Sequence, residues 1–206
     1  MELFFSPLAC SLATRIALYE ADLPATFTQV TLSTKRTGDD RDYFQVNPKG
    51  QVPALQTDDG ALLTEGPAVL QYVADLAPDS GLAPAAGTPA RYTLQTWLNY
   101  VATEVHKQVF AMMFNPATPQ EAKAFARQLL EAKLAYLDGH LTGRETLLGE
   151  DFTVADCYLI TALNWCRAIK LDLSAWPALA AYQARHEQRP AVARAMAEEA
   201  TLWDAA

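Results

Sequence analysis

The sequence predicts an α/β domain followed by an all-α domain. Short apolar segments alternate with helical segments over the first third of the chain, a Pro- and Gly-rich segment follows at 78–89, and only helical periodicity remains beyond it. The chain has 206 residues, of which 50% are hydrophobic, and this is enough for two modest domains with a real core. We place the first domain at 1–80, the linker at 81–90 and the second domain at 91–206.

Charge and cysteine content narrow the classes of function. The net charge of −8 argues against nucleic-acid binding, which needs a basic surface. No apolar run reaches membrane-spanning length, and the first residues lack the basic start of a signal peptide. Cys10, Cys157 and Cys166 are odd in number and widely spaced, so we expect no disulfide framework and a cytoplasmic protein. No Cys/His cluster has the spacing of metal ligands, so we expect no metal.

The first element is a short buried strand at 3–5, which Ser6-Pro7 ends. A helix is predicted over 9–21, so Cys10 falls where the strand passes into the helix. A thiol at a helix N-terminus meets free N–H groups and the positive end of the helix dipole, and both favour the reactive thiolate. The alternative is a small buried packing residue. Ser11 is expected either to donate a hydrogen bond or to cap the helix.

A second strand at 27–32 and a hairpin continue the first domain. Between them, Lys35 and Arg36 lie in a segment that we interpret as a solvated loop. The hairpin is predicted at 54–63, because two apolar segments flank a tight Asp59-Gly60 turn.

A helix is predicted directly after the hairpin. Pro67 suits the first position of this helix, which extends to about residue 76. Glu65 and Gly66 precede Pro67, and free N–H groups at such a helix start form a natural site for a carboxylate.

The proline-containing loop at 47–55 is the feature around which this domain is organised. Pro53 has no N–H and suits the first residue of a strand or a cis turn. If Val52-Pro53 is cis, the N–H and C=O of Val52 point outward and can pair with an extended, peptide-like ligand. An ordinary proline turn is the alternative. The order βαβ then ββα, with a proline at a strand corner and Cys10 before the first helix, is a thioredoxin-like pattern.

The second domain opens with a long helix at 91–114, which Asn115-Pro116 ends. One helical stripe is apolar and is interpreted as core: Leu98, Val101, Val105 and Val109. A second stripe changes from polar to apolar along the helix: Asn99, Thr103, His106, Phe110 and Met113. Such a graded stripe suits a ligand with a polar backbone and an apolar reacting end. A satisfied structural histidine is the alternative for His106.

Four more helices are predicted, at 119–140, at 154–169, at 178–188 and from Arg189-Pro190 onward. The first of these is expected to bury Phe125 with its leucines. Thr153 and Asp156 form a capping box before an almost wholly apolar helix. We therefore expect Asp156 to be a buried structural carboxylate that accepts hydrogen bonds from backbone N–H groups.

Several short motifs occur in order along the whole chain, and together they resemble bacterial cytosolic glutathione S-transferases, most closely the beta class. The motifs are Ser6-Pro7-Leu8-Ala9-Cys10-Ser11, the loop 47–55, Leu63-Thr64-Glu65-Gly66, Trp97-Leu98-Asn99-Tyr100, Thr103-Glu104-Val105-His106-Lys107 and Phe152-Thr153-Val154-Ala155-Asp156. Cys10 with His106-Lys107 is the pair specific to the beta class. The resemblance implies a thioredoxin-like domain, an all-helical domain and a homodimer.

The resemblance also implies positions of site residues. Catalysis would involve Cys10, His106 and Ser11. The co-substrate glutathione would be bound by Cys10, Lys35, Gln51, Val52, Pro53, Glu65, Gly66, Asn99, Thr103, Glu104, Val105, His106 and Lys107, some of them from the neighbouring subunit. A small hydrophobic electrophile would lie against Phe110, Met113 and Trp165. Val52 would pair with the cysteinyl backbone of glutathione, Glu65 and Gly66 with its γ-glutamyl end, and Lys35 with its glycyl carboxylate.

Three positions depart from the pattern that the resemblance implies. Gly66 stands where many relatives carry serine, so a hydroxyl contact to glutathione is lost. Leu8 replaces a small glycine before Ala-Cys and could narrow the approach to Cys10. Phe5 stands where other classes carry a catalytic tyrosine, so a tyrosine-stabilised thiolate is not expected.

The function that follows is conjugation of the glutathione thiolate to small hydrophobic electrophiles, with thiol–disulfide exchange through Cys10 as a further capacity. One alternative is a non-catalytic protein on the same fold that binds glutathione or a hydrophobic ligand and acts in regulation. Another is a thiol–disulfide reductase, which is weakened by the lack of a second cysteine at Cys-x-x-Cys spacing.

Overall fold

The computed structural model describes residues 1–204. The chain forms two compact units, and each is treated by itself: Met1–Ala83 with the chain from Arg189 onward, and Pro84–Gln188. The boundary near residue 83 lies close to the predicted linker. The last helix differs from the prediction, because it belongs to the first unit and not to the helical one. It packs on the first helix of the chain, and ion pairs join the two.

The first unit contains a five-stranded sheet in the order β3-β2-β1-β4-β5. The strands are β1 (Glu2–Phe5), β2 (Thr26–Thr31), β3 (Arg36–Thr37), β4 (Ala54–Gln56) and β5 (Leu62–Thr64). β1 and β2 are parallel, and the other pairs are antiparallel. This is the predicted thioredoxin-like order, and the predicted fold class is confirmed.

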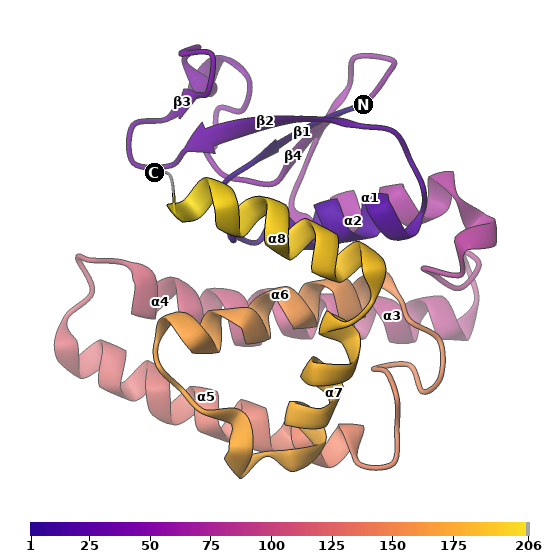
Figure 1. Ribbon diagram of the computed structural model, residues 1–206, viewed down its shortest axis with the longest axis vertical. Coiled ribbons are helices and arrows are strands. Elements are labelled where there is room, and N and C mark those ends of the chain that lie inside the picture. Colours follow the sequence, from indigo (N-terminus) through magenta and orange to yellow (C-terminus); the bar gives the residue numbers. More distant parts are fainter. Residues whose placement is uncertain (205–206) are drawn as a thin grey trace. The chain divides into compact units, whose positions relative to one another are not determined.

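Three helices accompany this sheet: α1 (Leu12–Glu20), α2 (Gly66–Leu76) and α8 (Pro190–Asp204). α1 packs against both α2 and α8 (Figure 1). A hydrophobic cluster packs Phe4 of β1 together with Tyr43 and Val52. The sheet therefore supports the loop that was predicted to bind a ligand.

The strand β3 was not predicted, since Arg36 was assigned to a solvated loop. Arg36 and Thr37 pair with Thr31 and Val30 of β2. A strand of two residues carries no alternating pattern that a sequence analysis could detect.

The helical unit consists of one long helical segment and three further helices. The long segment comprises α3 (Pro89–Asn99), the π-helix η3 (Tyr100–Phe110) and α4 (Ala111–Phe114). The others are α5 (Gln120–Leu141), α6 (Val154–Ala168) and α7 (Pro177–Glu187). Short 3₁₀ turns lie in the first unit at Tyr43–Gln45 and Pro78–Ser80, and in the helical unit at Leu173–Ala175. Within residues 1–204, no helix is both long and apolar enough to cross a bilayer.

Two features of the helical unit correct the sequence analysis. The middle of the long helix is a π-helix, in which hydrogen bonds reach back five residues, as from the Ala111 N–H to the His106 carbonyl. Each residue then turns through a smaller angle than in an α-helix, yet the predicted core stripe is fully buried along its whole length: Leu98, Val101, Val105 and Val109. Phe125 on α5 was expected inside, but its side chain is 57% exposed.

Asp156 has the structural role that the capping box predicted. Its carboxylate accepts hydrogen bonds from the N–H and the hydroxyl of Thr153, from the N–H of Leu147 and from the hydroxyl of Tyr182, each at 2.9 Å. Burial raises the pKa of Asp156, and these donors counteract that effect. The carboxylate thus joins the start of α6 to the preceding loop and to α7.

We expect Asp156→Ala to lower the free energy of unfolding by about 3 kcal/mol, because it removes a cap and leaves several buried donors without an acceptor. Urea unfolding measures this loss. Asp172→Ala is the matched control, since Asp172 caps an exposed turn through Ser174 and its loss should lower the free energy of unfolding much less. Equal losses in the two variants would contradict the assigned role of Asp156.

Candidate functional site

The proline loop has the predicted geometry, since the Val52-Pro53 peptide bond is cis. The carbonyl oxygen of Gln51 accepts hydrogen bonds from the Tyr43 hydroxyl at 2.9 Å and from the Asn47 amide at 2.8 Å. Among the described residues, none accepts a hydrogen bond from the Val52 N–H. The loop is therefore fixed from behind, and the Val52 N–H stays available to a ligand.

Gly50 and Lys35 complete the support of this loop. Gly50 has a φ of +60°, and a Cβ there would come within 2.7 Å of the Phe44 ring, so a larger residue is excluded on two grounds. The Lys35 ammonium group donates to the Gly50 carbonyl at 2.8 Å. The structure thus places the predicted cation, Lys35, beside the loop at Gly50, two residues before Val52.

Cys10 lies next to Val52, but outside the first helix. The helix begins at Leu12, and the Cys10 thiol donates a hydrogen bond to the Val52 carbonyl at 3.1 Å. The helix thus begins three residues later than predicted, and Cys10 lies between β1 and α1, as predicted. The same contact occupies the Val52 carbonyl, which was predicted to be open to a ligand. The two groups that the sequence proposed for one site are nevertheless in direct contact.

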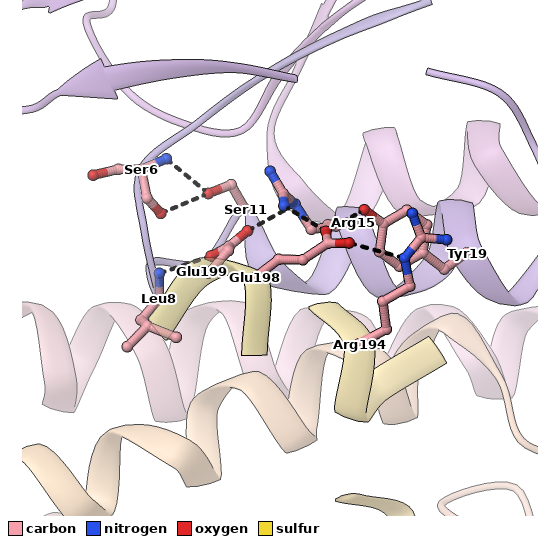
Figure 2. Close-up of polar contacts among 8 residues, drawn as sticks. All are labelled: Ser6, Leu8, Ser11, Arg15, Tyr19, Arg194, Glu198 and Glu199. Carbon is pink, nitrogen blue, oxygen red and sulfur yellow. Dashed lines mark hydrogen bonds and ion pairs between the residues drawn. The ribbon is translucent and has the colours of Figure 1, made fainter. Parts of the chain in front are cut away.

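Of the two roles predicted for Ser11, the structure shows hydrogen-bond donation and not capping. Ser11 is the N-cap residue of α1, yet its side chain caps no N–H of the helix. Its buried hydroxyl accepts from the Ser6 N–H at 3.1 Å and donates to the Ser6 carbonyl at 3.3 Å (Figure 2). Ser11 thus closes the turn that carries Cys10.

Two neighbours of this turn show how it is built. Leu8 has a φ of +56°, which a side chain with a Cβ adopts only at a cost. Phe5 is buried, with the Arg15 guanidinium 4.3 Å above its ring, and its edge faces the Phe27 ring. Phe5 is thus a packing residue.

The start of α2 is the second polar part of the first unit. Glu65 precedes the helix with a φ of +72°, an unusual conformation for a residue other than glycine. Its exposed carboxylate lies 2.5 Å from the Lys49 ammonium group. Gly66 and Pro67 are the first helical residues, as predicted. Strained residues of this kind often occur at functional sites.

In the helical unit, His106 projects from η3 into an aromatic environment. Its Nδ1 lies 2.8 Å from the Tyr158 hydroxyl oxygen, and its ring is 4.8 Å from the Trp165 ring. Burial, and to a smaller extent the neighbouring Lys107 charge, lowers the pKa of His106 to about 4. The imidazole is therefore neutral at physiological pH. Tyr158 was not predicted as a site residue.

Two of the three predicted apolar residues, Phe110 and Trp165, lie in one aromatic cluster. The Trp165 ring contacts the rings of Phe110 and Phe114, with centroids 5.3 and 6.1 Å away. Phe110 is fully buried, so it supports this cluster from inside and offers no surface to a ligand. Phe114, which was not predicted, is 47% exposed, and the third predicted residue, Met113, is partly exposed.

The remaining predicted positions of the helical unit fall into three groups. Asn99 and Thr103 are exposed, and each donates a hydrogen bond to the carbonyl four residues before it. Glu104 lies 2.5 Å from the Lys133 ammonium group, and Lys107 is exposed. Val105 is fully buried, so its side chain belongs to the core. Within residues 1–204, no group of three or more His, Cys, Asp or Glu side chains gathers that could hold a metal ion.

Comparisons with known proteins agree with this geometry. The family model "Glutathione S-transferase, N-terminal domain" matches residues 9–76, and "Glutathione S-transferase, C-terminal domain" matches residues 100–190. Glutathione S-transferase GstA of Escherichia coli O157:H7 is 47% identical over 199 residues, which cover 97% of this chain and 98% of that protein.

Two solved structures are also similar over almost the whole chain. A sphingomonad glutathione S-transferase complexed with glutathione has a TM-score of 0.93 and 46% identity, covering 97% of this chain and 99% of that one. The bacterial beta class glutathione S-transferase of Sphingomonas chungbukensis has a TM-score of 0.93 and 43% identity, with 97% and 98% covered.

We expect the His106 ring to titrate at a pH of about 4, well below the value of about 6.5 for an exposed imidazole, because protonation would bury a charge. NMR titration of the ring proton signals measures this. The unfolded chain binds the proton from about pH 6.5 downward, whereas the folded chain does not, so this group lowers the free energy of unfolding as the pH falls from 6.5 to 4.

Lys107→Gln is the control for that titration. It removes the smaller of the two causes, so the midpoint should rise only slightly and stay far below 6.5. A wild-type midpoint near 6.5 would show that His106 is not buried.

Proposed function

The chain belongs to the glutathione S-transferase family, and from this premise we propose how its own residues bind glutathione and carry out the transfer. It is a glutathione transferase, which conjugates the thiolate of glutathione to small hydrophobic electrophiles. The observation that carries the proposal is the Val52 backbone, whose N–H is available at a fixed loop while its carbonyl lies 3.1 Å from the Cys10 thiol.

In this proposal the cysteinyl part of glutathione pairs with the backbone of Val52. The tripeptide is extended and has its own N–H and C=O groups, so it can replace the missing strand partner of this residue. The Val52 N–H donates to the ligand. The Cys10 thiol moves off the Val52 carbonyl, which then accepts from the ligand.

The two ends of glutathione carry different charged groups and therefore need different binding residues. The γ-glutamyl end has an ammonium and a carboxylate group, which suit the Glu65 carboxylate and the free N–H groups at the start of α2. The glycyl carboxylate suits Lys35, which lies beside the loop through Gly50. Gln51 and Pro53 contribute by holding the shape of the loop.

We assign to His106 the hydrogen bond that stabilises the sulfur of glutathione. With the Tyr158 hydroxyl donating to Nδ1, the neutral ring carries its proton on Nε2. That N–H can donate to a thiolate, which favours the reactive anion. The apolar end of the site is then formed by Met113 and Trp165, whereas the buried Phe110 stays beneath them.

Asn99, Thr103, Glu104 and Lys107 remain proposed contacts to the polar part of glutathione. Their side chains are exposed or partly exposed, which a ligand contact requires. Family membership supports a homodimer. The thiols of Cys10, Cys157 and Cys166 are not joined in disulfides within residues 1–204, which supports a reducing compartment such as the cytoplasm.

We also propose that Cys10 exchanges with glutathione disulfide. The Cys10 thiolate attacks one sulfur of the disulfide, a Cys10–glutathione disulfide forms, and the second glutathione leaves as a thiolate that takes up a proton. Conjugation needs only the thiolate of glutathione, so the two activities are separable.

We expect Glu65→Gln to weaken glutathione binding about 10- to 100-fold, because a charged hydrogen bond to the ligand ammonium group is lost. Calorimetry with glutathione measures the change. Lys49→Gln is the matched control, since it removes the ion pair partner of Glu65 and leaves Glu65 in place. Its affinity should equal or exceed that of the wild type. Absence of wild-type binding at millimolar glutathione would refute the proposed site.

We expect Cys10→Ala to abolish the glutathione adduct and to retain part of the conjugating activity, whereas His106→Ala lowers kcat about 100-fold with a smaller effect on glutathione affinity. Steady-state kinetics and mass spectrometry give these values. Cys157→Ala should keep the adduct, since this buried cysteine is a packing residue. Loss of all conjugation in Cys10→Ala, or unchanged kinetics in His106→Ala, would contradict the assignment.

A further inference from the structure

The last helix carries two adjacent carboxylates that face α1 within the first unit. Figure 2 shows Glu198 and Glu199 of α8 against Arg15 and Tyr19 of α1. We call Arg15, Tyr19, Arg194, Glu198 and Glu199 the α1–α8 cluster. The cluster has no part in the binding and transfer steps derived above. Its two carboxylates, however, have different partners.

Glu199 reaches from this cluster to the backbone that leads into Cys10. It is fully buried, and its Oε2 accepts a hydrogen bond from the Leu8 N–H at 2.7 Å. Its Oε1 lies 3.1 Å from Nε of Arg15. Burial raises the pKa of Glu199 to about 7, while Arg15 and the Leu8 N–H counteract this. A buried carboxylate is costly unless it is paired, so this contact is a specific one.

The Leu8 N–H, to which the Glu199 carboxylate is bonded, belongs to a residue with an unfavourable backbone conformation. Leu8 has a φ of +56°, a left-handed conformation that is unfavourable for a residue with a Cβ. A charge-assisted hydrogen bond to its N–H offsets this cost. The Glu199 carboxylate therefore holds Leu8 in a conformation that the residue would not choose by itself.

The conformation of Leu8 sets the position of the Cys10 sulfur. The turn continues through the Ala9 N–H, which donates to the Ser6 carbonyl at 3.0 Å, and Ser11 closes it on Ser6. At the end of this turn the Cys10 thiol reaches the Val52 carbonyl. Rotation at Leu8 would carry the sulfur away from Val52.

We propose that Glu199 is a positioning residue for Cys10, which holds the Leu8 turn so that the Cys10 sulfur lies beside the Val52 backbone. This inference rests on the proposed exchange between Cys10 and glutathione disulfide. A glutathione molecule bound to Val52 then presents its sulfur to Cys10 at the right place, and exchange becomes fast relative to that of a freely moving thiol.

Glu198 supplies the matched control. It lies on the same helix and accepts from Arg15 at 3.1 Å, from the Tyr19 hydroxyl at 2.5 Å and from Arg194 at 2.9 Å. It makes no contact with Leu8 among these bonds. Its removal takes a carboxylate from Arg15, as removal of Glu199 does, and leaves the turn in place.

The experiment compares Glu199→Ala, Glu199→Gln and Glu198→Ala in the full chain at pH 8, where Glu199 is ionised. Mass spectrometry follows two rates at Cys10: adduct formation with glutathione disulfide, and alkylation by iodoacetamide, which needs no glutathione site. Thermal melting reports stability.

We expect Glu199→Ala to form the adduct about tenfold more slowly and to be alkylated faster, because the sulfur is misplaced for glutathione but released from the Val52 carbonyl. Glu199→Gln keeps an oxygen that accepts from the Leu8 N–H and should recover part of both rates. Glu198→Ala should melt at a lower temperature and react at the wild-type rates.

Three outcomes would overturn the inference: wild-type rates in Glu199→Ala, equal losses in Glu198→Ala, or no recovery in Glu199→Gln. If Glu199→Ala fails to fold, the comparison of Glu199→Gln with Glu198→Gln decides, and equal rates would then refute the inference. A wild-type protein that forms no adduct would refute the proposed exchange, while the alkylation rates would still decide the role of Glu199.

Discussion

The Val52 backbone can serve a ligand only because the carbonyl group before it is held from behind. The buried side chains of Tyr43 and Asn47 both donate to the Gln51 carbonyl. These two bonds hold the peptide group between Gln51 and Val52, so it cannot rotate. Two donors on one carbonyl use both of its lone pairs. Burial, together with a smaller effect of Cys10, raises the pKa of Tyr43 to about 12, so its hydroxyl keeps its proton and remains a donor. The outward direction of the Val52 N–H follows from this arrangement. The proposed reaction of Cys10 depends on it, because the ligand must first bind at Val52.

The sequence predicted those parts of the molecule that local patterns determine. Pro53, the Thr153–Asp156 capping box and Pro67 at the start of α2 each act through their own backbone, so neighbouring residues were enough to recognise them. The contact between Glu199 and Leu8 joins positions 191 residues apart, and no local pattern of α8 indicates it. The π-helix was missed for another reason, since its wider turn depends on packing and leaves the predicted core stripe buried, so the stripe gives no sign of it.

The aromatic surroundings of His106 show how packing selects one chemical form of a residue. Removal from water is the main cause of its lowered pKa, and the neighbouring Lys107 charge acts in the same direction, so the imidazole stays neutral. A neutral ring has one donor and one acceptor nitrogen. The partner of Nδ1 is the Tyr158 hydroxyl, at 2.8 Å, and donation from this hydroxyl gives the Nε2–H form proposed above. Tyr158 lies in an almost wholly apolar helix, so its sequence surroundings suggested only a core residue.

Asp156 and Glu199 illustrate how a costly buried carboxylate can serve different ends. Asp156 accepts from four donors of its own unit, which counteract the rise in its pKa that burial causes. Glu199 has fewer partners, the Leu8 N–H and the Arg15 guanidinium group, and its pKa is about 7. The Glu199 carboxylate is therefore compensated only in part, and it binds a strained residue, Leu8. Its burial lowers the stability of the fold and adds nothing to the packing of the core. Such a cost is kept where it fixes a conformation that the chain does not adopt unaided. In this unit that conformation is the Leu8 turn, and the reactive group that it carries is the thiol of Cys10.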